Sequence, residues 1–130
     1  LRKLTWHIKS KVNISAMRKA AKLLTGKHDF SSFCASGGDD NDFVRTIMTL
    51  DVGRRTLDIW KGSKFEVLSC RVVGNGFLYK MVRNIVGTLV EVGLGRLDVK
   101  DLNRILKAKD RRKAGRTAPA QGLCLVKVVF

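Results

Sequence analysis

The spacing of apolar residues along the chain predicts a first helix and a long central helix. Asn13 is a favourable capping residue, apolar side chains recur every three or four positions from there to Leu24, and Gly26 is placed to end the helix. The segment 77–92 is mostly apolar around its circumference. This pattern predicts a buried central helix that ends near Gly93.

Two shorter helical segments are also predicted. Asp98 is expected to cap a third helix, and Asp29 is expected to cap one helical turn that brings Phe30 and Phe33 onto the same face. These two rings could stack on nucleic-acid bases, although this spacing is more typical of a hydrophobic core. In the third helix, the residues expected to face the core are Val99, Leu102, Ile105 and Leu106.

Apolar and β-branched residues, some in alternation, predict the strands. Four segments carry this pattern: 45–52, 56–60, 65–73 and 123–130. Short turns at 53–55 and 61–64 favour antiparallel neighbours, and the Gly- and Asp-rich segment 36–42 is expected to form a loop. The order of elements therefore predicts a single α+β domain, an antiparallel β-sheet with helices packed on it.

The net charge of the chain indicates what kind of partner it binds. Its 130 residues carry 26 Lys and Arg against 11 Asp and Glu, a net charge of +15. Such an excess repels itself in the folded state, so a polyanionic partner such as nucleic acid is favoured. An anionic membrane surface and solubility without a partner are the rival interpretations, but no segment combines a strongly basic face with a Trp/Phe/Leu face. No apolar run approaches the ~18 residues of a membrane span. The chain begins at Leu1 instead of Met, which suggests a trimmed chain, a processed product or a further upstream segment.

The cysteines and histidines argue against a disulfide framework or a metal site. Cys34, Cys70 and Cys124 are odd in number and widely spaced, and neither His7 nor His28 lies at a ligand spacing from them. All three cysteines are expected to be reduced thiols in an intracellular protein.

Arg83 is the first candidate for a functional residue, because a guanidinium on an apolar helix is costly unless it finds a partner. It shares one helical stripe with Lys80, Gly87 and Glu91. One interpretation is a solvated polar face in which Arg83 pairs with Glu91 through neighbouring side chains or water. The other is an arginine that orients a carboxylate or a phosphate in a cleft.

The run 107–116 is the second candidate, with six basic residues against one acidic residue. Such a run is usually a solvated helix end. Its continuation through Gly115 and Arg116 also offers backbone N–H groups and cations together, which suits a phosphate.

Three parts of the chain together resemble the TruA-type tRNA pseudouridine synthases. They are residues 13–33, residues 76–89, and residues 108–111 followed by 118–125. Order and spacing agree over nearly the whole chain, and the sequence Met-Val-Arg-Asn at 81–84 is the most specific part.

The resemblance implies half of an enzyme. Members of this family join two similar α+β halves into one continuous antiparallel sheet, with the active site in the central cleft. The nucleophilic Asp and a catalytic Tyr come from the N-terminal half, whereas this chain, over residues 1–130, resembles the C-terminal half. The reaction converts uridine to pseudouridine in the anticodon stem-loop of tRNA without a metal or organic cofactor. The implied partners are tRNA, the N-terminal half and, in a homodimer, a second copy of the enzyme.

The resemblance also assigns site residues. Arg83 matches the Arg that pairs with the catalytic Asp, and Leu123 matches the apolar residue that packs on the target base. Together with the charge pattern, it gives the expected substrate-binding residues Leu123, Lys80, Tyr79, Asn84, Arg116, Lys109, Arg111 and Arg112. A non-catalytic RNA-binding module of the same fold is the alternative function. A ribosomal-type structural protein would explain the charge but not the helix around Arg83.

Overall fold

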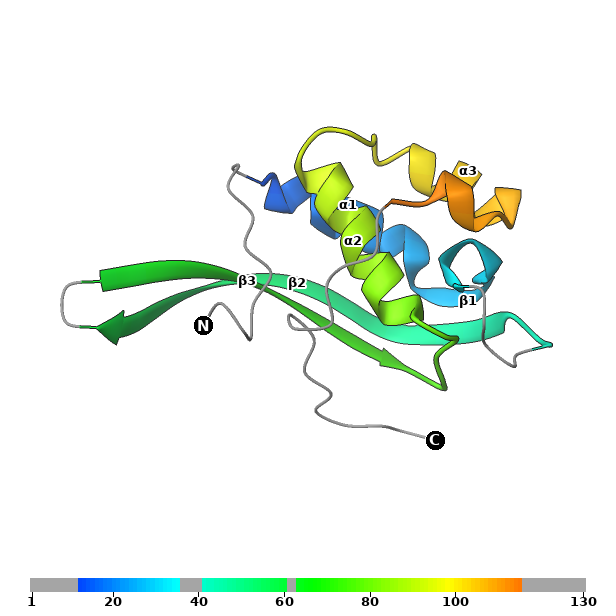
Figure 1. The fold of residues 1–130 in the computed structure, drawn as a ribbon, viewed down its shortest axis with the longest axis horizontal. Helices are drawn as coiled ribbons and strands as arrows, with labels where there is room; N and C mark the ends of the chain where they lie inside the picture. The colour runs from blue at the N-terminus through cyan, green and yellow to red at the C-terminus, as the bar shows by residue number, and fades with distance from the viewer. Residues whose placement is uncertain (1–11, 36–40, 61–62, 116–130) are drawn as a thin grey trace.

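A computed structural model of the chain describes residues 12–35, 41–60 and 63–115 (Figure 1). The elements in order are α1 (Ile14–Leu24), β1 (Gly26–Asp29), the 3-10 turn η1 (Ser31–Phe33), β2 (Val44–Trp60), β3 (Ser63–Gly74), α2 (Met81–Gly93), α3 (Asp101–Ala108) and the 3-10 turn η2 (Arg111–Lys113). The described part is therefore an antiparallel sheet with helices packed on it, and the predicted α+β class is confirmed.

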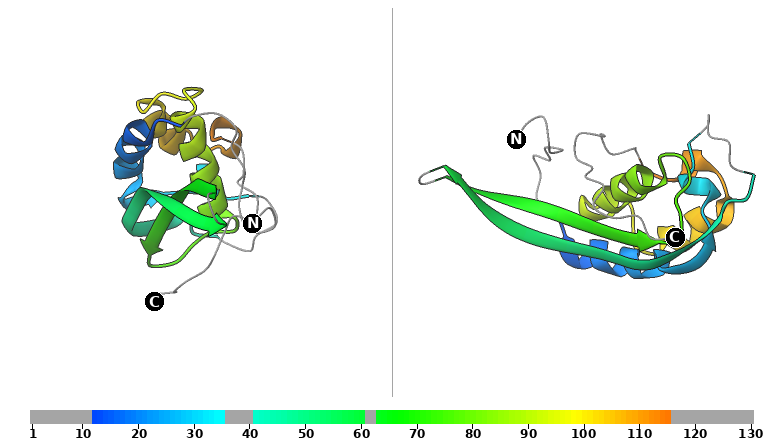
Figure 2. Two further views of the ribbon diagram at one scale, coloured as in Figure 1. Left: turned by 90° about the vertical axis from the view of Figure 1, so that its left-hand side faces the viewer. Right: turned by 90° about the horizontal axis from the view of Figure 1, so that it is seen from below.

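The sheet is built on one long hairpin. Its strand order is β1-β2-β3, and both pairings are antiparallel. The helices lie together on one face of the sheet, and the far end of the β2–β3 hairpin extends beyond them (Figures 1 and 2). No helix within the described ranges is long and apolar enough to cross a membrane.

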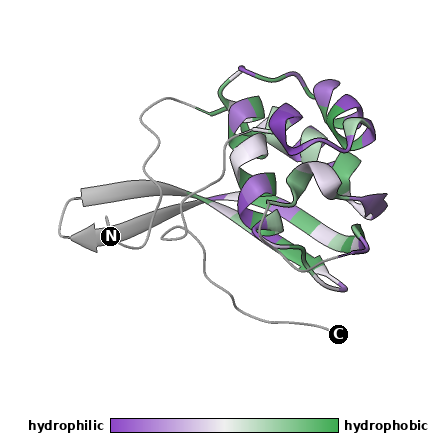
Figure 3. Ribbon diagram, turned by 45° about the vertical axis from the view of Figure 1, so that its right-hand side comes forward, coloured by the Kyte–Doolittle hydropathy of each residue, from purple (hydrophilic) through white to green (hydrophobic). Residues whose placement is uncertain are grey.

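A β-bulge sets which residues of β2 face the helices. Hydrophobic and polar residues alternate along the strands (Figure 3). The register shifts between Ile47 and Thr49, which places Ile47 on the same face as Leu50 and Val52 although the spacing is uneven. Those three side chains are buried, while Met48 is 53% exposed. The bulge thus lets one strand continue while its apolar face stays on the core.

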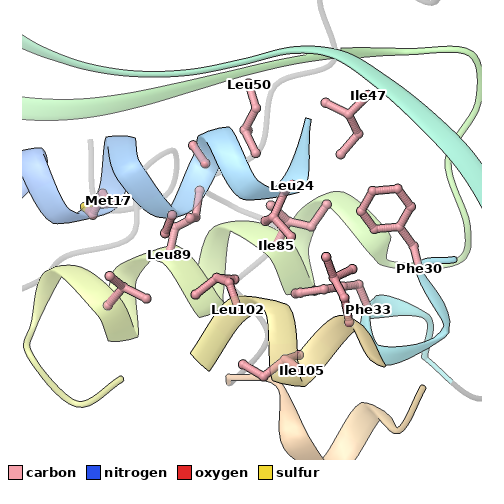
Figure 4. Close-up of a cluster of buried hydrophobic side chains, with 14 of the residues drawn as sticks. Met17, Leu24, Phe30, Phe33, Ile47, Leu50, Ile85, Leu89, Leu102 and Ile105 are labelled. Atoms are coloured by element: carbon pink, nitrogen blue, oxygen red, sulfur yellow. The ribbon is translucent and has the colours of Figure 1, made fainter. Parts of the chain in front are cut away.

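The core joins all three helices to the sheet and to η1. Figure 4 shows side chains from each of these elements meeting between the helices and β2. Its fully buried members include Met17, Leu24, Phe30, Phe33, Ile85, Leu89 and Leu102. Both phenylalanines of the predicted helical turn are core residues, so their side chains are closed to a base. Phe30 and Phe33 are therefore core residues and not residues that stack on bases.

The first helix forms as predicted. Asn13 caps it, because its side-chain oxygen accepts a hydrogen bond from the Ala16 N–H at 3.1 Å, and Gly26 follows its end with a positive φ of 97°. α1 packs tightly on the end of α2: a Cβ built on Gly93 would lie 2.7 Å from the sulfur of Met17. A larger residue at position 93 would therefore have to displace the Met17 side chain.

Two strand predictions were wrong. Residues 53–55, expected as a turn, continue β2 and pair with residues 67–69 of β3. The segment 63–74 is long enough to pair along nearly the whole of 44–60, so no reversal at Gly53 is needed. β1 was missed because its four residues, Gly26–Asp29, carry no apolar alternation; they pair with residues 44–47.

Both later helices begin after their predicted starts. α2 starts at Met81 and not at Phe77, because the carbonyl of Tyr79 accepts a hydrogen bond from the Ala35 N–H at 3.1 Å instead of entering the helix. α3 starts at Asp101, preceded by a turn in which the Asp101 N–H donates to the Asp98 carbonyl. Asp98 therefore belongs to the turn before the helix. The predicted strand 123–130 and most of the predicted loop 36–42 lie outside the described residues.

Candidate functional site

The entry to α2 presents an aromatic ring and a cation to solvent. Lys80 adopts a left-handed backbone conformation with φ 57°, and its ammonium lies 5.3 Å from the centre of the Tyr79 ring. Tyr79 is 44% exposed, and Lys80 is exposed as well. The backbone here is fixed by the hydrogen bond from Ala35. These two side chains can therefore offer a stacking surface and a positive charge at one place.

Arg83 lies in the first turn of α2 and is half-buried, between the buried residues Met81 and Asn84 on the same helix. The predicted stripe is graded along the helix: Lys80 is exposed, Arg83 half-buried and Gly87 buried. Arg83 is therefore neither enclosed in the core nor fully solvated, which is the placement expected of a side chain at the wall of a cleft.

Glu91, at the far end of the stripe, lies near another arginine. Its Oε1 is 3.4 Å from Nη1 of Arg96, and the Arg96 side chain is 60% exposed. Surface pairs of this kind contribute little to stability.

Asn84 is completely buried and connects α2 to two other segments. Its amide Nδ2 donates to the Phe33 carbonyl at 2.7 Å, and its Oδ1 accepts from Nη2 of Arg111 at 3.2 Å. The structure therefore links Arg111 to the residue that follows Arg83 on α2. Asn84 itself cannot reach a bound substrate directly in this position.

The basic segment, here defined as residues 109–115, folds as a tight turn between α3 and the outer surface of α2. Lys109 has φ 51°, and its ammonium lies 3.8 Å from the carboxylate of Asp29. Asp110 caps η2 by accepting from the Arg112 N–H at 3.0 Å, and its carboxylate also binds the Arg112 guanidinium. Each of the two acidic residues thus pairs with one cation of the basic segment.

The basic segment ends in direct contact with the backbone of α2. The Gly115 N–H donates to Oγ1 of Thr88 at 2.9 Å. A Cβ built on Gly115 would lie 2.8 Å from the Cα of Thr88 and 3.3 Å from the Gly87 carbonyl oxygen. The basic segment therefore crosses α2 about one helical turn from Arg83, on the same stripe.

The local charges follow from these contacts. Burial alone raises the pKa of Asp29, but hydrogen bonds from the Ser31 hydroxyl and backbone and the charge of Lys109 outweigh it, so the pKa lies below its ordinary value. Hydrogen bonds from Arg112 lower the pKa of Asp110, and the same bond raises the pKa of Arg112. Burial lowers the pKa of Arg111, which as a guanidinium still stays charged at neutral pH.

The structure brings together part of the predicted site. Arg111 contacts Asn84, which follows Arg83 on α2. Lys109 and Arg112 belong to the same basic segment as Arg111, and Tyr79 and Lys80 lie just before the first residue of the helix. Leu123 and Arg116 lie outside the described residues. No group of three metal-ligating side chains is found among the residues that the structure describes.

Sequence reasoning missed four residues that organise this region, namely Asp29 as a lysine partner, Ser32, Thr88 and Asp110. Asp110 carried a signal, as the one acidic residue in a basic run. Ser32 and Thr88 carried none, because small polar residues are common at helix surfaces.

Comparison with known proteins gives one consistent result. A family model described as tRNA pseudouridine synthase matches residues 20–130. Proteins named tRNA pseudouridine synthase A are 47% identical over 124 residues in Brevibacillus brevis, 44% over 130 in Thermoanaerobacter sp. and 43% over 129 in Bacillus subtilis. These matches cover 95%, 100% and 99% of this chain but only 47%, 50% and 49% of the relatives. The chain spans about half the length of the curated relatives that it matches.

Proposed function

This chain belongs to the tRNA pseudouridine synthase family, and we propose that it is the C-terminal, RNA-binding half of an enzyme that isomerises uridine to pseudouridine in the anticodon stem-loop of tRNA. On this proposal residues 1–130 form the C-terminal domain, and the nucleophilic Asp and catalytic Tyr reside on the N-terminal half. The observation that carries the proposal is the position of Arg83, half-buried on α2 about one turn from the crossing of the basic segment.

The chemistry explains why an arginine is needed there. The uracil base is detached from its ribose and rejoined through carbon, so the bond from nitrogen to ribose breaks and a bond from carbon to ribose forms. An ionised carboxylate held in one orientation serves this reaction, and a neighbouring guanidinium both keeps it ionised and fixes its direction. Arg83 is the residue that we assign to this task, with no metal or organic cofactor.

The same proposal assigns RNA contacts to the surrounding cations. Lys109 and Arg112 are exposed and held in direction by Asp29 and Asp110, so they are suited to bind phosphates. Tyr79 and Lys80 supply a stacking surface and a charge just before α2. We keep Arg116 as a phosphate contact and Leu123 as the residue that packs on the target base, on the resemblance alone. Asn84 is buried and acts through Arg111.

The test uses the full-length enzyme with Arg83→Ala and Arg83→Lys. Losing a positioned, charge-paired contact costs about a hundredfold or more in rate, so we expect Arg83→Ala to lower kcat by about that factor while tRNA affinity changes little. Arg83→Lys should recover only part of the rate, because a lysine cannot hold a carboxylate through two parallel hydrogen bonds.

Arg96→Ala is the matched control, since Arg96 lies just after the same helix, is exposed and pairs with Glu91. It should leave both kcat and affinity unchanged. Normal turnover in Arg83→Ala would remove Arg83 from the reaction. A full-length protein that binds tRNA yet forms no pseudouridine on any tRNA would instead favour the non-catalytic RNA-binding module.

A further inference from the structure

We infer that Ser32, Asn84 and Thr88 are positioning residues for RNA binding: three buried polar side chains that hold the basic segment against α2 so that its cations meet the phosphate backbone. The inference rests on the proposed function, because it concerns the same RNA-binding surface. It adds three residues whose side chains lie behind that surface.

The three side chains share one property that packing alone does not explain. They are the buried polar residues of the described core, each with no exposed surface. Each accepts a hydrogen bond from the basic segment: Ser32 from the Asp110 N–H at 3.0 Å, Asn84 from the Arg111 guanidinium at 3.2 Å and Thr88 from the Gly115 N–H at 2.9 Å. All three therefore converge on one stretch of chain.

Each side chain also donates a hydrogen bond to a backbone carbonyl outside the basic segment. Ser32 donates to the Ile105 carbonyl, Asn84 to the Phe33 carbonyl at 2.7 Å and Thr88 to the Asn84 carbonyl at 2.8 Å. A buried polar group costs free energy unless its hydrogen bonds are made, and here each group bonds on two sides. The side chains thus form rigid links from η1, α2 and α3 to the basic segment.

The end of the basic segment shows how closely the parts fit. Gly115 touches the backbone of α2, where a Cβ would come within 2.8 Å of the Thr88 Cα and 3.0 Å of the Glu91 Cγ. Backbone atoms of a helix cannot yield easily to such an approach. The hydrogen bond to Thr88 and the absence of a side chain at 115 therefore fix one end of the segment, while Ser32 and Asn84 fix the other.

A fixed basic segment matters for RNA because ordering long side chains during binding costs conformational entropy. Lys109 and Arg112 start from backbone positions that are already set, and Asp29 and Asp110 direct their charged groups. If these hydrogen bonds are lost, the cations are still present, but their backbone is no longer held in one position against α2. Fewer of them then meet phosphates at the same time.

The test compares Thr88→Val, Thr88→Ser and Gly115→Ala in the full-length enzyme, with dissociation constants for unmodified tRNA measured over a range of salt concentrations. Thr88→Val keeps the shape and removes the hydroxyl, and Gly115→Ala pushes the basic segment off α2 without changing the core. We expect both variants to raise the dissociation constant about tenfold. The slope of log affinity against log salt should become shallower by the equivalent of about one to two phosphate contacts. Thr88→Ser keeps the hydroxyl and should retain the wild-type slope.

Two controls separate positioning from stability. Val90→Ala lies on the same helix, buried and away from the hydrogen-bonded links, and should lower the melting temperature without changing the salt slope. Thr25→Val removes a hydroxyl that bonds only locally, to the Lys22 carbonyl at 2.7 Å. This variant should change neither the melting temperature nor the salt slope. Wild-type slopes in both Thr88→Val and Gly115→Ala would overturn the inference and leave the three residues as core packing.

A triple variant distinguishes this failure from failure of the proposed function. Replacing Lys109, Arg111 and Arg112 together by Gln removes the cations themselves. If that triple variant binds tRNA like the wild type, the basic segment is not an RNA contact, and both the assignment of these cations and the inference fall. If the triple variant binds weakly while Thr88→Val and Gly115→Ala bind normally, the inference alone fails.

Discussion

Neutralising the basic segment should change how strongly tRNA binding depends on salt. Lys109, Arg111 and Arg112 lie on one rigid turn, with the Lys109 side chain 63% and the Arg112 side chain 89% exposed. Each phosphate that a cation neutralises releases counterions, and the release makes affinity fall as salt rises. Changing all three residues to Gln removes the charges and leaves a shorter, uncharged polar side chain at each position, while the hydrogen bonds from the Asp110 and Gly115 N–H groups to Ser32 and Thr88 are kept.

The magnitude follows from the number of cations in this part of the chain. Residues 107–113 carry five of them, and one phosphate for each gives a slope of about −4.5 for log affinity against log salt. Raising the salt from about 50 to about 200 mM would then weaken binding roughly 500-fold. With three cations removed, the slope should fall to about −1.8 and the loss to roughly 12-fold.

The assay is fluorescence anisotropy with labelled unmodified tRNA, repeated at several salt concentrations. A matched control changes Lys19, Lys22 and Lys27 to Gln, which removes the same charge from exposed positions on α1 and β1. The control should keep most of the slope. Equal losses in the two variants would show that total charge drives binding, and an unchanged slope in the first variant would refute the assignment of the basic segment.

Three further outcomes are expected. Purified residues 1–130 should bind tRNA without forming pseudouridine, and pseudouridine detected by nucleoside analysis would contradict the assignment of the nucleophile to the N-terminal half. Asp29→Asn should lower the free energy of unfolding by about 1 kcal/mol at pH 7. Because folding lowers the pKa of Asp29, this stability is present above the ordinary aspartate value of about 3.9 and is lost as pH falls through the folded value, so urea unfolding near pH 2 should show no difference. Gly93→Ala should cost about 1–3 kcal/mol in urea unfolding by overpacking Met17, whereas Gly53→Ala, which meets only the Ser69 hydroxyl at 3.3 Å, should cost clearly less.

Periodicity predicted the helices better than their boundaries. α1 was predicted at both ends, because its cap and its terminal glycine act through local backbone geometry. The start of α2 depends on a group that is distant in sequence, because the Ala35 N–H donates a hydrogen bond to the Tyr79 carbonyl. No local sequence pattern predicts such a contact. Residues 53–55 were predicted to be a turn because their local sequence favours a reversal of the chain. In the structure, pairing with β3 keeps them in a strand.

The candidate site was predictable where residue type alone restricts the role. A guanidinium on an apolar helix stands out in the sequence, so Arg83 is identifiable from the pattern of its neighbours, and its catalytic assignment stays a prediction. The run of cations was equally visible. Ser32 and Thr88 were not, because a hydroxyl becomes informative only when its burial and both hydrogen-bond partners are known.

Helix α2 explains why the core and the candidate site are difficult to separate. One face of this helix packs Ile85 and Leu89 against the sheet side of the core, as Figure 4 shows, and the opposite stripe carries Arg83 and receives Gly115. Interiors at native packing density transmit displacements, so a shift of α2 moves the guanidinium and the basic segment together. The hydrogen bonds of Asn84 and Thr88 strengthen that coupling, since both residues link the helix to the segment. A core substitution that tilts α2 should therefore disturb tRNA binding and turnover together, whereas a substitution within the basic segment should affect binding first.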